Sequence, residues 1–191
     1  MDIKPQPRYP FAFLQADAMT FPLEGFDFIW ASPPCQGYSI MRNLPWLRDK
    51  AYPLLIDPVR ERLRASGAHY TIENVMGAKL DAWWLCGGMF GLPFYRHRAF
   101  ETNFFWMQPG HPRHQFTVRN GRKMGARARD IVHSGVSAFQ GHGHRAAASA
   151  AQVREILGVP WMHEEYTQAI PPAYSEYIAR QLTPALNEAE A

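Results

Sequence analysis

Three side chains that can carry out chemistry, Asp17, Cys35 and Glu73, each lie shortly after a short apolar run of the sequence. A thiol becomes a nucleophile when its thiolate is stabilised by a cation or by backbone donors, and Arg96 and Arg98 are the candidate cations. Partial burial at a strand end would raise the pKa of Glu73, so that its carboxyl group could donate a proton near neutral pH. Thiol, acid and guanidinium together suit conjugate addition to an electron-poor ring. In that reaction the sulfur attacks, the acid protonates the ring and the guanidinium orients the substrate.

The two cysteines of the chain differ in their neighbours. Cys35 follows Pro33 and Pro34, which fix the backbone and remove hydrogen-bond donors, so the turn holds the thiol beyond the apolar run. A structural cysteine would sit inside such a run, as Cys86 does, and we expect Cys86 to belong to the core. So few cysteines favour a reducing compartment.

The elements that position these side chains are predicted from apolar runs and turn residues. Both faces of the runs are largely apolar, which is typical of buried strands, and strand, helix, strand in this order forms a βαβ unit. Ligands of such sheets bind outside the carboxyl ends of the strands, where the three reactive side chains fall. The predicted strands are Phe11–Leu14, Phe26–Trp30, Tyr70–Ile72, Trp83–Cys86 and Ala99–Trp106, and the predicted helices are Asp57–Ala65, Ala150–Leu157 and Tyr174–Leu182.

Composition predicts a single globular domain. The chain has 191 residues, 47% of them hydrophobic and 19% charged, which excludes disorder, collagen and coiled coil. With no apolar stretch of membrane-spanning length and no signal-peptide core, the sequence predicts a cytosolic protein. Between Arg96 and Arg129 eight basic residues stand against one acid, Glu101, and aromatic residues are interleaved with them. This basic block suits a polyanion-binding surface as well as it suits a solvated face.

Three short motifs occur in an order that resembles a known family. Pro33-Pro34-Cys35-Gln36, Glu73-Asn74-Val75 and Arg96-His97-Arg98 look like the signature of the DNA (cytosine-5)-methyltransferases, in particular short phage and bacterial members. Nearly the whole chain is covered, because segments 152–161 and 168–173 are similar to the two closing motifs of the family. The resemblance implies an α/β, Rossmann-like S-adenosylmethionine-dependent methyltransferase fold, N-terminally incomplete, and a place in the cytoplasm of a bacterial host cell.

The resemblance also implies a role for each residue of the site. Cys35 would add to C6 of a flipped cytosine, and Glu73 would contact N3 and the exocyclic amine of the ring. Arg98, with Arg96, would hold the base or stabilise the region of the nucleophile. C5 then takes the methyl group of S-adenosylmethionine, and loss of the C5 proton with β-elimination frees the enzyme. The residues expected to face the cofactor are Asp2, Asp17, Ala18, Pro33, Ala169 and Ile170, and those expected to face DNA are Pro34, Gln36, Asn74, Val75, Arg119, Arg122, Lys123 and Arg127.

The sequence departs from the family at two places. The family's Gln-x-Arg-x-Arg pattern has Phe94 in the place of its glutamine. Its Phe-x-Gly-x-Gly cofactor loop has no counterpart, because the first glycine here is Gly25. We therefore expect this chain alone to bind S-adenosylmethionine weakly. Three alternatives stay open: an open reading frame begun too late, a second polypeptide that supplies the N-terminal unit, or a fragment that no longer methylates.

The resemblance divides the chain into a catalytic core (1–103), a short basic target-recognition region that contacts DNA (104–150) and C-terminal helices that complete the core (151–191). Two other functions remain as alternatives: a catalytically inactive DNA-binding remnant of the same fold, and a thiol enzyme acting on free pyrimidine nucleotides. No metal site is predicted, because the spacing of the histidines is loose and no cysteine lies near them in the sequence. These histidines are His111, His114, His142 and His144.

Overall fold

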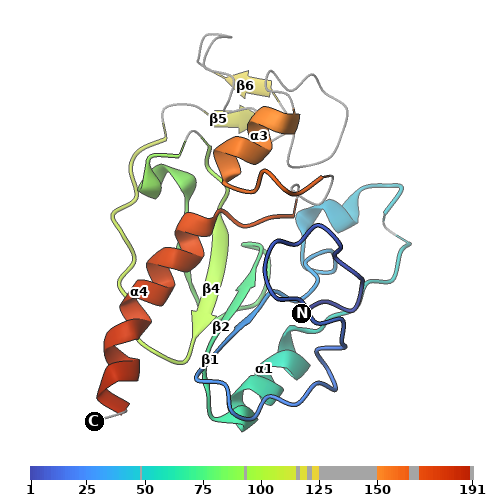
Figure 1. The fold of residues 1–191 in the computed structure, drawn as a ribbon. Coiled ribbons are helices and arrows are strands. Elements are labelled where there is room, and N and C mark those ends of the chain that lie inside the picture. The colour runs from blue at the N-terminus through green and yellow to red at the C-terminus, as the bar shows by residue number, and fades with distance from the viewer. Residues whose placement is uncertain are drawn as a thin grey trace.

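A computed structural model describes residues 1–47, 49–92, 94–114, 117–119, 122–124, 150–163 and 168–189. The protein is an α/β structure built on a mixed sheet of four strands in the order β1-β2-β4-β3 (Figure 1). Strands β1 and β2 are parallel, whereas β4 runs antiparallel to both β2 and β3. The strands are β1 (Phe28–Ala31), β2 (His69–Asn74), β3 (Trp83–Leu85) and β4 (Arg98–Thr102).

The predicted βαβ unit is confirmed. Helix α1 (Ile56–Ser66) connects the parallel strands β1 and β2, and it ends at Gly67, whose left-handed φ of 75° is accessible to glycine without strain. Leu63 of α1 packs against Tyr70 and Ile72 of β2 on one face of the sheet. Because Ala31 pairs with Ile72, the carboxyl ends of β1 and β2 lie side by side, and the segments that follow them start at one edge.

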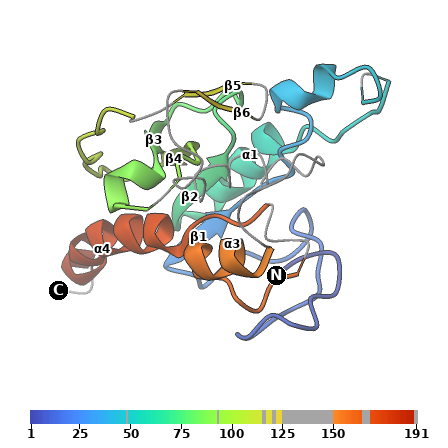
Figure 2. The same cartoon turned by 90° about the horizontal axis from the view of Figure 1, so that it is seen from above.

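The other face of the sheet is covered by helix α4 (Pro172–Ala189). Tyr174 and Ile178 of α4 form a buried cluster with Phe100 of β4, Leu85 of β3 and Trp106. Figure 2 shows α4 and α3 (Ala150–Leu157) on one side of the sheet and α1 on the other. Helices on both faces explain why the strands read as continuous apolar runs.

An ion pair fixes α1 to the sheet as well. Arg60 donates two hydrogen bonds to Glu101 of β4, from Nε to Oε1 at 2.6 Å and from Nη2 to Oε2 at 2.9 Å. The carboxylate also accepts a bond from the backbone N–H of Asp81 at 3.3 Å. Such a bidentate pair sets the orientation of the helix against the strand, and Glu101 raises the pKa of Arg60 further.

Several shorter elements complete the described chain. Two 3-10 helices, η1 (Ile40–Asn43) and η2 (Gly87–Phe90), follow the Cys35 loop and strand β3. Strands β5 (Thr117–Arg119) and β6 (Arg122–Met124) pair antiparallel as a separate two-stranded sheet within the predicted DNA-contact region. Among the helices that the structure describes, none combines the length and the apolar character that crossing a membrane requires.

One predicted strand is wrong. Residues 11–14 form no strand, and the backbone there makes only an isolated parallel bridge between Asp2 and Gln15. Phe11 is 65% exposed, so the apolar run is not packed inside the sheet. The helix predicted at Ala150–Leu157 has the predicted bounds, and the C-terminal helix starts slightly earlier and continues further than predicted.

Candidate active site

The register of β2 and β4 places Glu73 next to Arg98. It lies near the end of β2, is only 6% exposed and stands opposite Phe100 of β4. Arg98 is two residues away from Phe100 on the same strand and therefore on the same face. Its Nε lies 3.0 Å from Glu73 Oε1, which makes a nearly buried ion pair.

Opposing effects act on the protonation of Glu73. Burial raises its pKa above the usual value of 4.5, and the charge of Arg98, a hydrogen bond from Ser32 and the charge of Arg96 offset this only in part. The pKa of Arg96 falls to about 9, because of burial first and the neighbouring Arg98 second. Arg96 is therefore still a cation at neutral pH, and Glu73 takes up a proton more readily than an exposed glutamate.

Cys35 lies at the start of a turn that the same strand end holds in place. Its carbonyl oxygen accepts hydrogen bonds from the backbone N–H groups of Tyr38 at 3.1 Å and Ser39 at 2.9 Å. The residue is partly exposed, and a charge on Cys35 would raise the pKa of Arg96. The thiol is thus neither sealed in the core nor remote from the guanidinium groups.

Asn74 ties the cysteine loop to β2. Its Nδ2 donates to the carbonyl oxygen of Pro33 at 2.9 Å, and its Oδ1 accepts from the backbone N–H of Val75 at 3.0 Å. Asn74 is completely buried, and its amide positions the loop. The bond joins the residue next to Glu73 to the loop that carries Cys35.

Glycines let the two loops approach each other closely. A Cβ on Gly77, after β2, would lie only 2.7 Å from the carbonyl oxygen of Tyr38. A Cβ on Gly37 would lie 2.6 Å from Cδ2 of Leu54. Tyr38 in turn accepts a hydrogen bond from the backbone N–H of Ile56 at 3.0 Å, which links the loop to the start of α1.

Tyr174 is a positioning residue that sequence reasoning missed. Its hydroxyl group donates to the carbonyl oxygen of Arg96 at 2.7 Å in a fully buried bond. This contact fixes the backbone of Arg96-His97-Arg98, the arginine motif, against α4, across the sheet face that carries Glu73 and Arg98. The signal available in the sequence was its place two residues after Pro172, just beyond segment 168–173.

Some of the residues expected to face the cofactor have side chains that could bind S-adenosylmethionine. Asp2 and Asp17 are exposed, and the bridge between Asp2 and Gln15 brings their segments together. Each already accepts a backbone hydrogen bond, from Lys4 and Met19 respectively, both at 2.8 Å. Their carboxylates suit the hydroxyl and amino groups of S-adenosylmethionine. Gly25 has open space around it and forms no cradle for the rest of that molecule.

The other expected cofactor residues differ in their surroundings. Pro33 is buried, Ala18 is exposed, and Ala169 and Ile170 are half-buried. Ala169 packs against the cluster at the end of α3, and Ile170 packs against the cluster under α4. The structure therefore does not gather these residues into one described pocket.

The residues expected to face DNA are placed to different extents. Pro34 and Gln36 are exposed beside Cys35, and Val75 is half-buried. Arg119 and Arg122 pair with each other across the β5–β6 ladder, and Lys123 pairs with Val118. Arg127, together with His142 and His144, lies outside the described residues.

The fold brings Cys86, which is distant in sequence, next to the histidines. Cys86 is buried in the core as predicted, yet its Sγ lies 3.3 Å from Nε2 of His114. His114 Nε2 is 2.9 Å from His111 Nε2. Burial and the two neighbouring histidines lower the pKa of His97 to about 4, which keeps its ring neutral at physiological pH.

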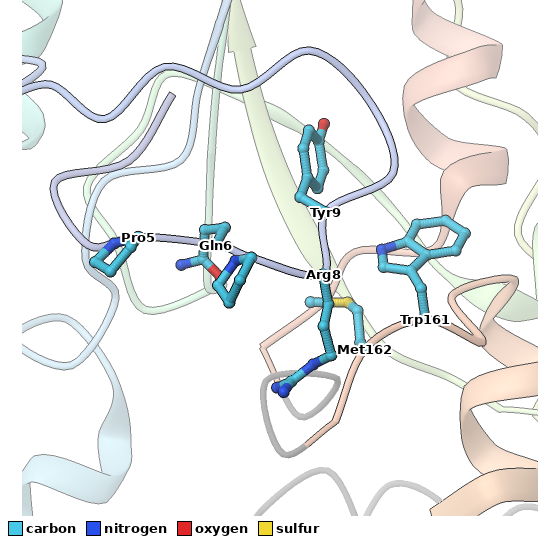
Figure 3. Close-up of a pocket in the computed structure, with 7 residues that line it drawn as sticks. Pro5, Gln6, Arg8, Tyr9, Trp161 and Met162 are labelled. Carbon is cyan, nitrogen blue, oxygen red and sulfur yellow. The ribbon is translucent and has the colours of Figure 1, made fainter.

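Two pockets lie away from Cys35 and Glu73. The first lies between the N-terminal segment, which contributes Arg8 and Tyr9, and the segment that carries Trp161 and Met162 (Figure 3). The second is lined by residues of β3 and β4 and by the aromatic residues that follow β4, including Phe105 and Trp106. Neither pocket is lined by a cysteine.

The arrangement can perform nucleophilic addition assisted by an acid. An accessible thiol, a buried carboxyl group with a raised pKa and two guanidinium groups meet at one sheet edge. No protein-family model, curated protein or solved structure matches the chain. The chemistry of the site is therefore read from its own geometry.

Proposed function

We propose that the chain is a DNA (cytosine-5)-methyltransferase that captures a flipped cytosine through a covalent bond to Cys35. The supporting observation is the buried hydrogen bond from Asn74 to Pro33, which ties the thiol loop to the strand end where Glu73 meets Arg98. The parallel β1–α1–β2 unit with helices on both faces of the sheet supports a Rossmann-like methyltransferase fold.

Capture of the base begins at Cys35. Its thiolate attacks C6, an S–C6 bond forms, and the electron pair of the C5=C6 bond moves into the ring. A proton carried by Glu73, whose pKa burial raises, passes to N3, so that the product is a neutral enamine with a nucleophilic C5. S-adenosylmethionine supplies the methyl group that C5 takes. The C5 proton then passes to water, the S–C6 bond breaks, and the N3 proton returns to Glu73, so that 5-methylcytosine and the thiolate of Cys35 are released.

The two arginines have separate tasks in this mechanism. Arg98 orients the carboxyl group of Glu73 through the 3.0 Å contact. Arg96 is buried and cationic, and it lies close enough to Cys35 for the two side chains to interact electrostatically. Tyr174 holds the Arg96 backbone and is a positioning residue.

The substrate is a base that has left the duplex, because C6 of a stacked cytosine cannot be reached by a side chain. The exposed residues Pro34 and Gln36 flank the thiol on the surface that the displaced base would approach. The basic positions of the β5–β6 hairpin would contact phosphates, which set affinity and orientation on DNA.

Two trapping substrates test the proposal. One duplex carries 2-pyrimidinone in place of cytosine and is incubated without S-adenosylmethionine, because this more electrophilic ring forms a stable thiol adduct unaided. The other carries 5-fluorocytosine and is incubated with S-adenosylmethionine, because methylation at C5 leaves no proton to eliminate. We expect an adduct resistant to denaturation with the first duplex, and none from Cys35→Ser.

The outcomes separate the alternatives. An adduct with 5-fluorocytosine shows complete methyl transfer, and an adduct with 2-pyrimidinone alone shows capture without methylation. DNA binding without either adduct would identify a non-catalytic DNA-binding protein and overturn the proposal. Equal trapping of a free 2-pyrimidinone nucleotide would point to an enzyme of free pyrimidines.

A further inference from the structure

We propose that Cys86, His97, His111 and His114 form a structural zinc site. Each residue offers one ligand atom, and the four atoms lie within 4.8 Å of one another. The site is independent of the proposed methyltransferase activity, because none of its four residues belongs to the Cys35 site.

The distances suit a tetrahedral ion. Zinc lies about 2.3 Å from a thiolate sulfur and about 2.0–2.1 Å from an imidazole nitrogen, which separates ligand atoms by about 3.3–3.6 Å. Sγ of Cys86 lies 3.3 Å from Nε2 of His114, and that atom lies 2.9 Å from Nε2 of His111. Outward movements of a few tenths of an ångström at these atoms would open the centre for the ion.

The sheet brings the first two ligands together. In the antiparallel ladder of β3 and β4, Leu85 pairs with Arg98. The next facing positions beyond that pair are Cys86 and His97, which are therefore neighbours despite their separation in sequence. His111 and His114 come from the segment that follows β4, which returns to this end of the ladder.

Aromatic rings hold the histidines at this position. Tyr95 stacks on His114 with ring centroids 3.7 Å apart and an interplanar angle of 6°. Trp84 contacts His97 and His111, with centroids 5.3 Å and 4.9 Å away. Packing of this kind restricts the rings before a metal arrives, so little ordering is needed on binding.

The chemistry of the four groups selects the metal and its role. One thiolate and three imidazoles are ligands that zinc prefers over magnesium or calcium, which take oxygen. Four protein ligands fill a tetrahedral shell and leave no open position for water, so the ion is structural. It would join the segment that follows β4, through His111 and His114, to the residues just before β4.

The test uses the full chain purified without chelators. We expect about one zinc per chain by elemental analysis. After exchange to Co²⁺ we expect the absorption of a tetrahedral ion together with a thiolate-to-cobalt charge-transfer band. Cys86→Ser should lose that band, whereas Cys35→Ser should keep it.

A pair of histidine variants measures the contribution of a ligand. His111→Ala should weaken zinc binding by at least the ~10–100-fold that loss of an outer-shell partner costs. His163→Ala, which replaces an exposed histidine outside the cluster, should leave the affinity unchanged. Circular dichroism shows whether each variant is folded.

Two results would overturn the proposal. One is a folded wild-type chain that retains no zinc after dialysis against the metal and gives no tetrahedral cobalt spectrum. The other is a charge-transfer band that Cys35→Ser removes and Cys86→Ser does not. The first result is measured on the wild-type chain, and the second compares two matched cysteine variants. A single variant that fails to fold therefore leaves the test valid.

Discussion

Glu73 couples the protonation of the site to the stability of the fold. Burial raises its pKa in the folded chain above the usual 4.5, so the folded state binds this proton more tightly than the unfolded state does. The protonated carboxyl group therefore favours folding at low pH. This contribution decreases as the pH rises above about 4.5 and is lost above the folded-state pKa.

The Glu73→Gln variant makes that coupling measurable. Glutamine cannot ionise, so the unfolding free energy of the wild type should fall relative to that of Glu73→Gln as the pH rises from about 4.5. Urea unfolding at a series of pH values measures both curves. Glu61→Gln, an exposed position on α1, is the matched control and should run parallel to the wild type. Parallel wild-type and Glu73→Gln curves would contradict the expectation.

Asn74 provides a second test, at the loop that presents the thiol. Asn74→Ala leaves the carbonyl oxygen of Pro33 without its buried donor, and we expect a loss of about 1–3 kcal/mol in unfolding free energy. A displacement of the loop by about 1 Å is enough to slow trapping of 2-pyrimidinone about 100-fold. The rate of adduct formation measures this effect.

Asn103→Ala is the control for Asn74→Ala, because Asn103 also forms hydrogen bonds to backbone atoms at β2. Asn103 accepts from the N–H of Tyr70 at 2.8 Å and donates to the carbonyl oxygen of Ala68 at 3.0 Å, at the opposite end of β2. Asn103→Ala should also lower stability but leave the trapping rate nearly unchanged. Equal slowing by both variants would show that Asn74 acts only through general stability.

Helix α4 holds the arginine motif from the other face of the sheet. The hydroxyl group of Tyr174 donates to the carbonyl oxygen of Arg96 in a buried bond, while that of Tyr177 donates to Met107 at 2.8 Å in an exposed one. Tyr174→Phe should therefore cost about 1–3 kcal/mol of unfolding free energy. Tyr177→Phe should cost less than about 1 kcal/mol, because water can replace the lost donor.

The same pair distinguishes a positioning role from a purely structural one. If Tyr174 positions Arg96, Tyr174→Phe should slow trapping by Cys35 at a temperature where the variant is fully folded. Tyr177→Phe, one turn further along α4, should trap at the wild-type rate. Trapping reactions quenched at successive times and analysed by denaturing electrophoresis give both rates. Identical trapping rates for the two variants would exclude the positioning role.

The strands could be predicted from the sequence where an apolar run lies between helices on the two faces of the sheet. The run at β2 is buried, the run at β1 is partly buried, and the helix between them shows its periodicity through Val59 and Leu63. Residues 11–14 have the same composition, yet Phe11 is largely exposed. A run of this kind becomes a strand only when a neighbouring strand offers backbone partners, and composition carries no information about that neighbour.

The site was predictable to the extent that it depends on strand ends. Cys35 follows β1 and Glu73 lies near the end of β2, and because these strands are parallel, local sequence sufficed to place both residues toward one edge of the sheet. The nearness of Cys86 to His97 depends instead on the register of two antiparallel strands, which the spacing of cysteines and histidines along the chain does not contain. The contact between Tyr174 and Arg96 likewise depends on how α4 packs across the sheet.

Across the molecule, the cysteine loop and the basic region meet at the arginine motif. Arg96 and Arg98 lie beside Glu73 at the start of β4, and the chain continues from β4 through the histidines toward the β5–β6 hairpin. If the segment between β4 and the hairpin is rigid, it would fix the orientation of bound DNA relative to Cys35 and Glu73. The hairpin is thus where affinity for DNA is expected to arise, separately from capture of the base.

The salt dependence of DNA affinity tests whether that affinity arises at the β5–β6 hairpin. Each phosphate contact to duplex DNA contributes about 0.9 to the slope of log affinity against log salt. Replacing Arg119, Arg122 and Lys123 together by alanine should therefore reduce the slope by about 2.7 if all three contact phosphates. Fluorescence anisotropy with a labelled duplex at several salt concentrations gives the slope.

The control for this hairpin variant removes the same charge elsewhere. Lys50, Arg64 and Lys79 are exposed and lie outside the basic block, so replacing them by alanine should leave the slope nearly unchanged. A general effect of net charge would lower both slopes equally, because long-range attraction depends on total charge, whereas phosphate contacts depend on position. A wild-type affinity that does not change with salt would exclude phosphate contacts altogether and, with them, the hairpin as a DNA-binding element.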